Sequence, residues 1–519
     1  MTAARRSLKL SPHMSRRLSC FCAALWLSGI VPTAVFAAEE LPLVRRQWFE
    51  TRTAHFNIYS CGAPQPVFKV AAQLEQFCEG YSLLAGANAV ASPPVIVMAF
   101  PDHEAMKPFL PIYHAQPANL AAFFQHGTDE NLIALSLSGA NGPDMSVVFH
   151  EYTHLLLRRN DRIWPMWLKE GMAEIYSTFQ TTGYNAAVAL PIERHLQTLA
   201  QPPWLPLTEL FAVTHDSPNY NERDRQGVFY AESWLLTHFL FAGDNPNYRA
   251  RFGNFTTLLR AGQAPVPAFT NALGVALPVM EADLRRYLAR GQFPAMSFAL
   301  PANIVTLKPL ATRKLTPVEN YFRLGDELLR IDRPDAAEKY FRDAHKLAPA
   351  SPLPHEGLGM LAIQREQPSE AVHQLKQAVA LNSGNFLAHY LYAWEQFKLA
   401  AAADQSNSLP KDRAAEIRAE LLKSLTLMPN FGPAHELFGI VELAQGQQLA
   451  LAEAHLQLAV QLEPENLYYQ LALANAQAGC REIATARNTL APLLRPNVEA
   501  KLRLSAEKLL RQLQSPQSD

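Results

Sequence analysis

The chain has 519 residues, of which 49% are apolar and 18% are charged, which is enough apolar material for packed cores in about two to four domains. This composition excludes a disordered or a collagen-like chain. The formal net charge is −1, and the charged residues are dispersed without a long basic block. Because phosphate binding needs a concentrated Lys and Arg surface, the charge pattern argues against nucleic acid as the main partner.

The first 37 residues have the features of a secretory signal peptide. Five basic residues precede or open an apolar stretch that runs from Leu18 to Phe36, and small residues follow at Ala37 and Ala38. This order predicts cleavage near Ala37 and a periplasmic or secreted protein without a membrane span. A retained membrane anchor is the alternative, because the stretch is about long enough to cross a bilayer. Without residues 1–37 the net charge becomes 41 − 47 = −6.

Residues 38–292 are predicted to form one domain in which strands come first and helices follow. Apolar residues alternate, or form short runs, in the predicted strands, and they recur at helical spacing in between. The predicted elements are a strand over 54–60, a helix over 66–84, a strand over 95–100 and a hairpin of strands 119–126 and 131–137. From Asp144 to about Gly291 the pattern is mainly helical. This order predicts an α+β domain.

The segment that carries chemistry is His150-Glu151-Tyr152-Thr153-His154. On a helix, positions i and i+4 share a face, so the imidazoles of His150 and His154 can reach one metal ion. Glu151 lies beside that face, where its carboxylate can hydrogen-bond a metal-bound water instead of acting as a ligand. This is the HExxH pattern of the zincins.

A second motif follows at Trp167-Leu168-Lys169-Glu170-Gly171-Met172-Ala173, in which Glu170 lies sixteen residues after His154. Pro165 is suited to begin a second helix. Two helices joined by a short turn lie antiparallel, so Glu170 can reach the two histidines. We therefore expect His150, His154 and Glu170 to bind one Zn²⁺ and to leave a fourth position for water.

With these residues the chain resembles gluzincin metallopeptidases, close to the group called peptidase MA-like. In that clan the third ligand is a Glu on the helix after HExxH, often within W-L-x-E-G-x-A, and residues 167–173 match this run. The gap between His154 and Glu170 is shorter than in thermolysin-like and aminopeptidase N-like members, and a tighter connecting turn would absorb the difference. The resemblance implies a zincin-like fold and a zinc peptidase with Glu151 as general base.

The resemblance also implies roles for three further features. In thermolysin-like relatives an acidic residue one turn after the third ligand orients the first zinc histidine. The residue at that position here is Glu174, and the alternative is that Glu174 is a solvated surface carboxylate. Aminopeptidase N-like members have a tyrosine that supports the oxyanion at a place comparable to Tyr230, with a core tyrosine as the alternative. The strand over 132–137 would pair with an extended substrate, as edge strands do in this clan, or would be an ordinary hairpin strand.

Residues 293–315 contain prolines and lack a helical face, which predicts a linker. Residues 316–513 repeat: Gly325, Ala337, Phe341 and Ala344 recur 34 residues later as Gly359, Ala371, Leu375 and Ala378. This spacing resembles the tetratricopeptide repeat (TPR), a pair of antiparallel helices, and a generic helical bundle is the alternative. We expect about five repeats and a capping helix near 499–513. Their concave face is expected to recruit a protein partner or substrate.

Together these features predict an exported zinc peptidase with a TPR array. An endopeptidase is favoured, because no motif that would bind a free N-terminus is seen. The alternative function is a TPR interaction scaffold whose peptidase-like domain is inactive and only structural. The intact His150, Glu151, His154 and Glu170 argue against that alternative, because an inactive domain need not keep the general base.

Overall fold

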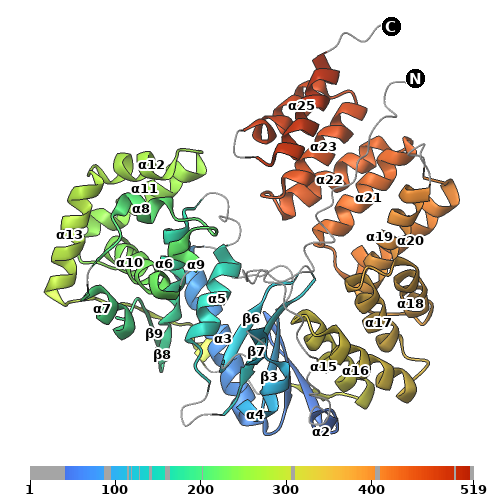
Figure 1. The fold of residues 1–519 in the computed structure, drawn as a ribbon, viewed down its shortest axis with the longest axis horizontal. Coiled ribbons are helices and arrows are strands. Elements are labelled where there is room, and N and C mark those ends of the chain that lie inside the picture. Colours follow the sequence, from blue (N-terminus) through green and yellow to red (C-terminus); the bar gives the residue numbers. More distant parts are fainter. Residues whose placement is uncertain are drawn as a thin grey trace. The chain divides into compact units, whose positions relative to one another are not determined.

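The chain forms an N-terminal region that ends at Lys314 and a helical array that begins at Leu315 (Figure 1). This computed structural model describes residues 41–86, 95–113, 116–117, 120–127, 129–138, 143–157, 164–201, 203–221, 223–305, 310–403, 409–495 and 498–514. The predicted signal peptide, residues 1–37, lies outside the described residues. Among the helices that are described, none is long and apolar enough to cross a membrane.

A six-stranded mixed sheet forms one layer of the N-terminal region, with the strand order β11-β1-β2-β3-β7-β6. Strands β2, β3 and β7 run parallel to one another, and the other three pairings of the sheet are antiparallel. Every residue of β3 and of β7 is buried, as expected for parallel strands that are covered on both faces. The strands are β1 (Trp48–Arg52), β2 (Phe56–Cys61), β3 (Val95–Phe100), β6 (Ala122–Gln125), β7 (Asn131–Ser136) and β11 (Thr312–Lys314).

Two features of this sheet differ from the sequence-based expectation. Helix α3 (Pro64–Ala85) connects the parallel strands β2 and β3, so the region is an α/β arrangement with a mixed sheet and not simply strands followed by helices. The strand predicted as a substrate-binding edge, residues 132–137, corresponds to β7, which already pairs with β3 on one side and β6 on the other. Its backbone groups are therefore used within the sheet, and β6 is the edge strand on that side.

The helices after residue 146 pack closely against one another, and α6 is their centre. All 12 residues of α6 (Met166–Ser177) are buried. Gly171 in α6 lies against α10 (Arg223–Phe241): a Cβ placed at this residue would be 2.0 Å from Oγ1 of Thr237 and 2.4 Å from the carbonyl oxygen of Ser233. The glycine in the Glu-Gly pair therefore lets α6 approach the α10 backbone.

The remaining helices of this region are α2 (Leu41–Val44), α4 (His103–Met106), α5 (Ser146–Leu157), α7 (Glu193–Leu199), α8 (Leu207–Ala212), α9 (Pro218–Asn221), α11 (Pro246–Arg260), α12 (Pro265–Leu273), α13 (Leu277–Arg290) and α14 (Ala302–Val305). Two smaller sheets complete it, formed by β4 (Ile112–Tyr113) with β5 (Gln116–Pro117), and by β8 (Gln180–Thr182), β9 (Asn185–Val188) and β10 (Met296–Ala299).

The segment 293–315, predicted as a linker, instead contributes two strands to the N-terminal region. Strand β10 pairs with β9, and β11 pairs with β1 at the end of the large sheet. The sequence pattern did not reveal them because β11 has only three residues, all exposed, and β10 alternates without an apolar run. Backbone pairing with β1 defines β11, whereas Met296 and Phe298 of β10 also pack, partly buried, against the core.

The C-terminal array consists of antiparallel helix pairs, five of them within its described residues, followed by the single helix α25 (Ala500–Gln514). Small residues let paired helices approach: a Cβ at Gly325 would be 2.7 Å from the Phe341 ring, and one at Gly359 would be 2.7 Å from Cγ of Leu375. The pairs are α15 (Pro317–Arg330) with α16 (Pro334–Leu347), α17 (Pro352–Gln364) with α18 (Pro368–Ala380), α19 (Phe386–Ala403) with α20 (Lys411–Leu427), α21 (Gly432–Gln445) with α22 (Leu449–Leu462), and α23 (Leu467–Gly479) with α24 (Ile483–Leu490). This is a TPR-like architecture.

Candidate metal centre

Helix α5 presents the two histidines of the HExxH segment on one face and packs its opposite face into the core. The ring of Phe149 stacks on that of Phe77 in α3, with centroids 4.5 Å apart and an interplanar angle of 4°. Tyr152 is fully buried next to Phe56. These aromatic contacts fix the rotation of α5, so the side chains of His150 and His154 remain 14% and 22% exposed.

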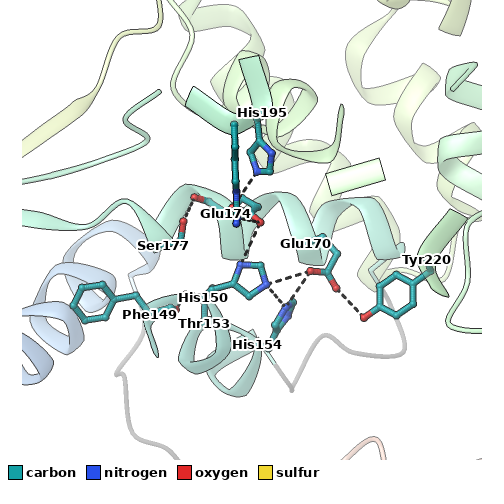
Figure 2. Close-up of polar contacts among 10 residues, drawn as sticks. Phe149, His150, Thr153, His154, Glu170, Glu174, Ser177, His195 and Tyr220 are labelled. Carbon is teal, nitrogen blue, oxygen red and sulfur yellow. Dashed lines mark hydrogen bonds and ion pairs between the residues drawn. The ribbon is translucent and has the colours of Figure 1, made fainter. Parts of the chain in front are cut away.

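Helix α6 places Glu170 opposite these histidines (Figure 2). Oε2 of Glu170 lies 3.4 Å from Nε2 of His150 and 3.2 Å from Nε2 of His154, and the two Nε2 atoms are 3.2 Å apart. Zinc–nitrogen and zinc–oxygen bonds are about 2.0–2.2 Å long, so two ligand atoms of a tetrahedral zinc site are separated by about 3.3–3.6 Å. The three atoms are therefore spaced nearly as one face of such a tetrahedron.

The hydrogen bonding of Glu170 also fits a metal ligand. Its side chain is 2% exposed, and Oε2 lies within ion-pair distance of both imidazole rings without a hydrogen bond of good geometry to either. A buried carboxylate oxygen without a hydrogen bond is costly unless a cation compensates it. Within the described residues, His150, His154 and Glu170 are the one group of three His, Cys, Asp or Glu side chains whose ligand atoms converge in this way.

The charges around the trio determine its protonation. Burial lowers the pKa of His150, but the carboxylates of Glu170 and Glu174 outweigh burial and raise it to about 9. Burial raises the pKa of Glu170, but the two histidines outweigh it and hold that pKa well below its usual range. Glu170 is thus ionised, as a ligand must be, and a metal ion would have to displace a proton from the histidine pair.

Glu174 is buried beside His150, so it is not the solvated surface carboxylate considered as an alternative. Its side chain is 2% exposed, with Oε1 3.6 Å from Nδ1 of His150 and Oε2 3.2 Å from Nε2 of His195 (Figure 2). The guanidinium of Arg194 donates to both carboxylate oxygens, at 3.2 and 3.3 Å. Burial raises the pKa of Glu174, but these cationic and imidazole neighbours lower it on balance. The carboxylate is therefore placed to orient the His150 ring through Nδ1.

The other two predicted catalytic residues lie near the trio. Glu151 is half-buried on α5, and its negative charge contributes to raising the pKa of both His150 and Tyr220. The Tyr230 ring lies on α10, with its centroid 6.3 Å from that of His150. Tyr230 also contacts Tyr220, whose ring is 6.3 Å away in a stacked arrangement. Tyr230 is thus a neighbour of the candidate metal centre and not a tyrosine remote from it in the core.

Tyr220 is the site residue that sequence reasoning missed. Its hydroxyl donates a hydrogen bond to Oε1 of Glu170 at 3.3 Å (Figure 2). It lies in α9, a helix of four residues, which is too short to produce a periodic pattern. By contrast, His238 is a packed core histidine away from the trio: it is fully buried, with Nε2 2.9 Å from the carbonyl oxygen of Ala189 and Nδ1 2.9 Å from the Tyr287 hydroxyl.

Comparisons with solved structures match part of the chain to TPR proteins. No family model matches the chain, and no curated protein matches it in sequence. A thermophilic TPR protein of Thermus thermophilus shows 23% identity over 37% of this chain and 99% of its own, with a TM-score of 0.28. YrrB, a TPR protein with an unusual peptide-binding site, shows 17% identity over 36% and 91%, with a TM-score of 0.31. PilF of Pseudomonas aeruginosa shows 19% identity over 38% and 88%, with a TM-score of 0.29.

Proposed function

We propose that the N-terminal region is a zinc-dependent peptidase of the gluzincin type. The observation that carries this proposal is the convergence of three ligand atoms, from His150, His154 and Glu170, at spacings of 3.2–3.4 Å. Together they form a His₂Glu set, which is typical of catalytic zinc sites that keep an open fourth position. The peptide substrate class rests on the HExxH and W-L-x-E-G-x-A motifs that hold these residues.

Bound zinc would supply a Lewis acid that polarises the scissile carbonyl and lowers the pKa of water toward about 7. The chain's own residues provide the proton transfers. Glu151, half-buried beside the histidine face, accepts a proton from the attacking water and then donates it to the leaving amine. The hydroxyl of Tyr230 is the nearest candidate to stabilise the oxyanion that develops on the substrate. Glu174 holds the ring of His150 by facing its Nδ1.

We further propose that the protein is exported and that it acts on protein substrates. The N-terminal signal pattern supports export to the periplasm or the exterior. The helix pairs of the array offer a stacked surface that supports recruitment of a protein substrate or partner. We favour internal cleavage of polypeptides, because the motifs contain no site for a free N-terminus.

The test compares peptide hydrolysis by the wild-type chain, Glu151→Gln and the surface control Glu193→Gln. A library of unstructured peptides serves as substrate, and zinc content is measured in the same samples. Glu151→Gln is expected to keep zinc and to lose hydrolysis, since an amide cannot accept a proton at neutral pH. Glu193 is exposed on α7 and contacts Gln197, so its substitution is expected to have no effect. Zinc binding without any hydrolysis in the wild type would instead favour an inactive peptidase-like domain attached to a TPR scaffold.

A further inference from the structure

The two carboxylate oxygens of Glu170 have different surroundings. Oε2 faces the Nε2 atoms of His150 and His154, at 3.4 and 3.2 Å. Oε1 points the other way and accepts a hydrogen bond from the hydroxyl of Tyr220 at 3.3 Å (Figure 2). One oxygen is therefore directed at the candidate metal position, while the other is held away from it.

We infer that Tyr220 is a positioning residue that restricts Glu170 to binding zinc through Oε2 alone. The inference rests on the proposed function, since it concerns the same metal centre. A carboxylate whose two oxygens are both available can bind a cation through one or through both of them. The hydrogen bond holds Oε1 toward Tyr220 and away from the candidate metal position, so the protein supplies three ligand atoms and the fourth position is left for water.

Tyr220 is itself held in place by aromatic contacts, which makes it suited to this role. Its ring packs edge-on against Phe229, with centroids 5.9 Å apart, and against His215 at 5.4 Å. It stacks on Tyr230 at 6.3 Å, and the Tyr230 hydroxyl is hydrogen-bonded to that of Tyr220. The hydroxyl of Tyr230 is thereby linked through Tyr220 to the ligand Glu170. A side chain fixed in this way loses little conformational freedom when it holds Glu170.

The short helix α9, which carries Tyr220, is held beside the candidate metal centre by its neighbouring helices. Helix α9 packs against α10, which carries Tyr230 and contacts α6 at Gly171. The three helices α6, α9 and α10 thus place the ligand, its positioning tyrosine and the second tyrosine side by side. Outer partners that orient a metal ligand commonly contribute about 10- to 100-fold to metal affinity or activity.

The test uses the full chain, with Tyr220→Phe as the variant and Tyr184→Phe as the matched control. Phenylalanine keeps the aromatic packing and removes only the hydroxyl, whereas Tyr184 is 53% exposed. Zinc affinity is measured by competition with a chelator, and coordination geometry by the visible absorption of the cobalt(II)-loaded protein. Unfolding of the metal-free forms, followed by tryptophan fluorescence, verifies that both variants fold.

Tyr220→Phe is expected to raise the zinc Kd by about 10- to 100-fold. Its cobalt bands should weaken, because a carboxylate bound through both oxygens raises the coordination number above four. Tyr184→Phe should match the wild type in both measurements. A wild-type chain that binds zinc, together with a Tyr220→Phe variant of unchanged Kd and cobalt spectrum, would overturn this inference and leave the proposed function intact. A folded wild-type chain that binds neither metal would overturn both.

Discussion

Replacement of Gly171 by alanine tests the close approach of α6 and α10 on which the site geometry depends. The new Cβ would lie 2.0 Å from Oγ1 of Thr237 and 2.4 Å from the carbonyl oxygen of Ser233. Favourable contacts between heavy atoms need about 3.5–4.0 Å, so the helices must separate by about 1 Å. The Thr237 side chain can rotate away, but the Ser233 carbonyl belongs to the α10 backbone and cannot.

The expected free energy change combines two opposing effects. Alanine is favoured over glycine inside a helix by up to about 1 kcal/mol. Overpacking a buried contact typically costs about 1–3 kcal/mol, and here the clash is with backbone, so the upper part of that range applies. We therefore expect Gly171→Ala to destabilise the N-terminal region by about 1–2 kcal/mol on balance, which corresponds to about 2–4 °C in Tm for each kcal/mol.

Thermal unfolding followed by tryptophan fluorescence is the assay, because five of the six tryptophans in the described residues precede residue 315. Gly253→Ala on α11 is the matched control, since its Cβ would meet no atom within 4 Å and the change should be neutral or stabilising. The variant should also bind zinc more weakly, because α6 carries Glu170. Equal Tm values for the two glycine variants would refute the reasoning about the helix approach.

Three further outcomes are expected. Glu174→Ala should weaken zinc binding by about 10- to 100-fold while the chain still folds, which chelator competition measures. Arg313→Met should lower stability at neutral pH, because burial raises the pKa of Glu50 but Arg313 and Arg52 outweigh burial and lower it. A lowered pKa in the folded state stabilises the protein above the unfolded pKa, and this stabilisation is lost as the pH falls through the folded pKa. The urea midpoints of variant and wild type should therefore converge in acid, and a constant gap would contradict this assignment. A chain that ends after Lys314 should fold and bind zinc. A chain that ends at residue 292 should have a lower Tm, because it lacks strands β10 and β11.

Sequence reasoning succeeded where a residue type or a spacing determines the geometry. The i, i+4 spacing alone places His150 and His154 on one face of a helix, and Glu170, sixteen residues after His154, lies on the next helix where it reaches them. The helix pairs could be recognised from the repeated glycines for a similar reason, since Gly325 and Gly359 each lie against a large side chain of the paired helix. These are local constraints, which a pattern of residues can express.

The features that sequence reasoning missed depend on contacts between distant segments. Strand β11 has no apolar pattern and is defined by backbone pairing with β1, more than 250 residues earlier. The internal position of β7 depends on the strand order of the whole sheet, which no single segment encodes. Tyr220 reaches Glu170 only because α9 packs on α10, so its role depends on tertiary packing.

The central claim is that His150, His154 and Glu170 hold one zinc ion, and elemental analysis of the purified full chain tests it most directly. The chain is purified without chelators and its metal content is measured by mass spectrometry beside that of His154→Ala. The account predicts about one zinc per wild-type chain and the loss of most of it in the variant, because one ligand atom of the set is removed. A folded wild-type chain without zinc, or a His154→Ala variant that retains it, would contradict the account.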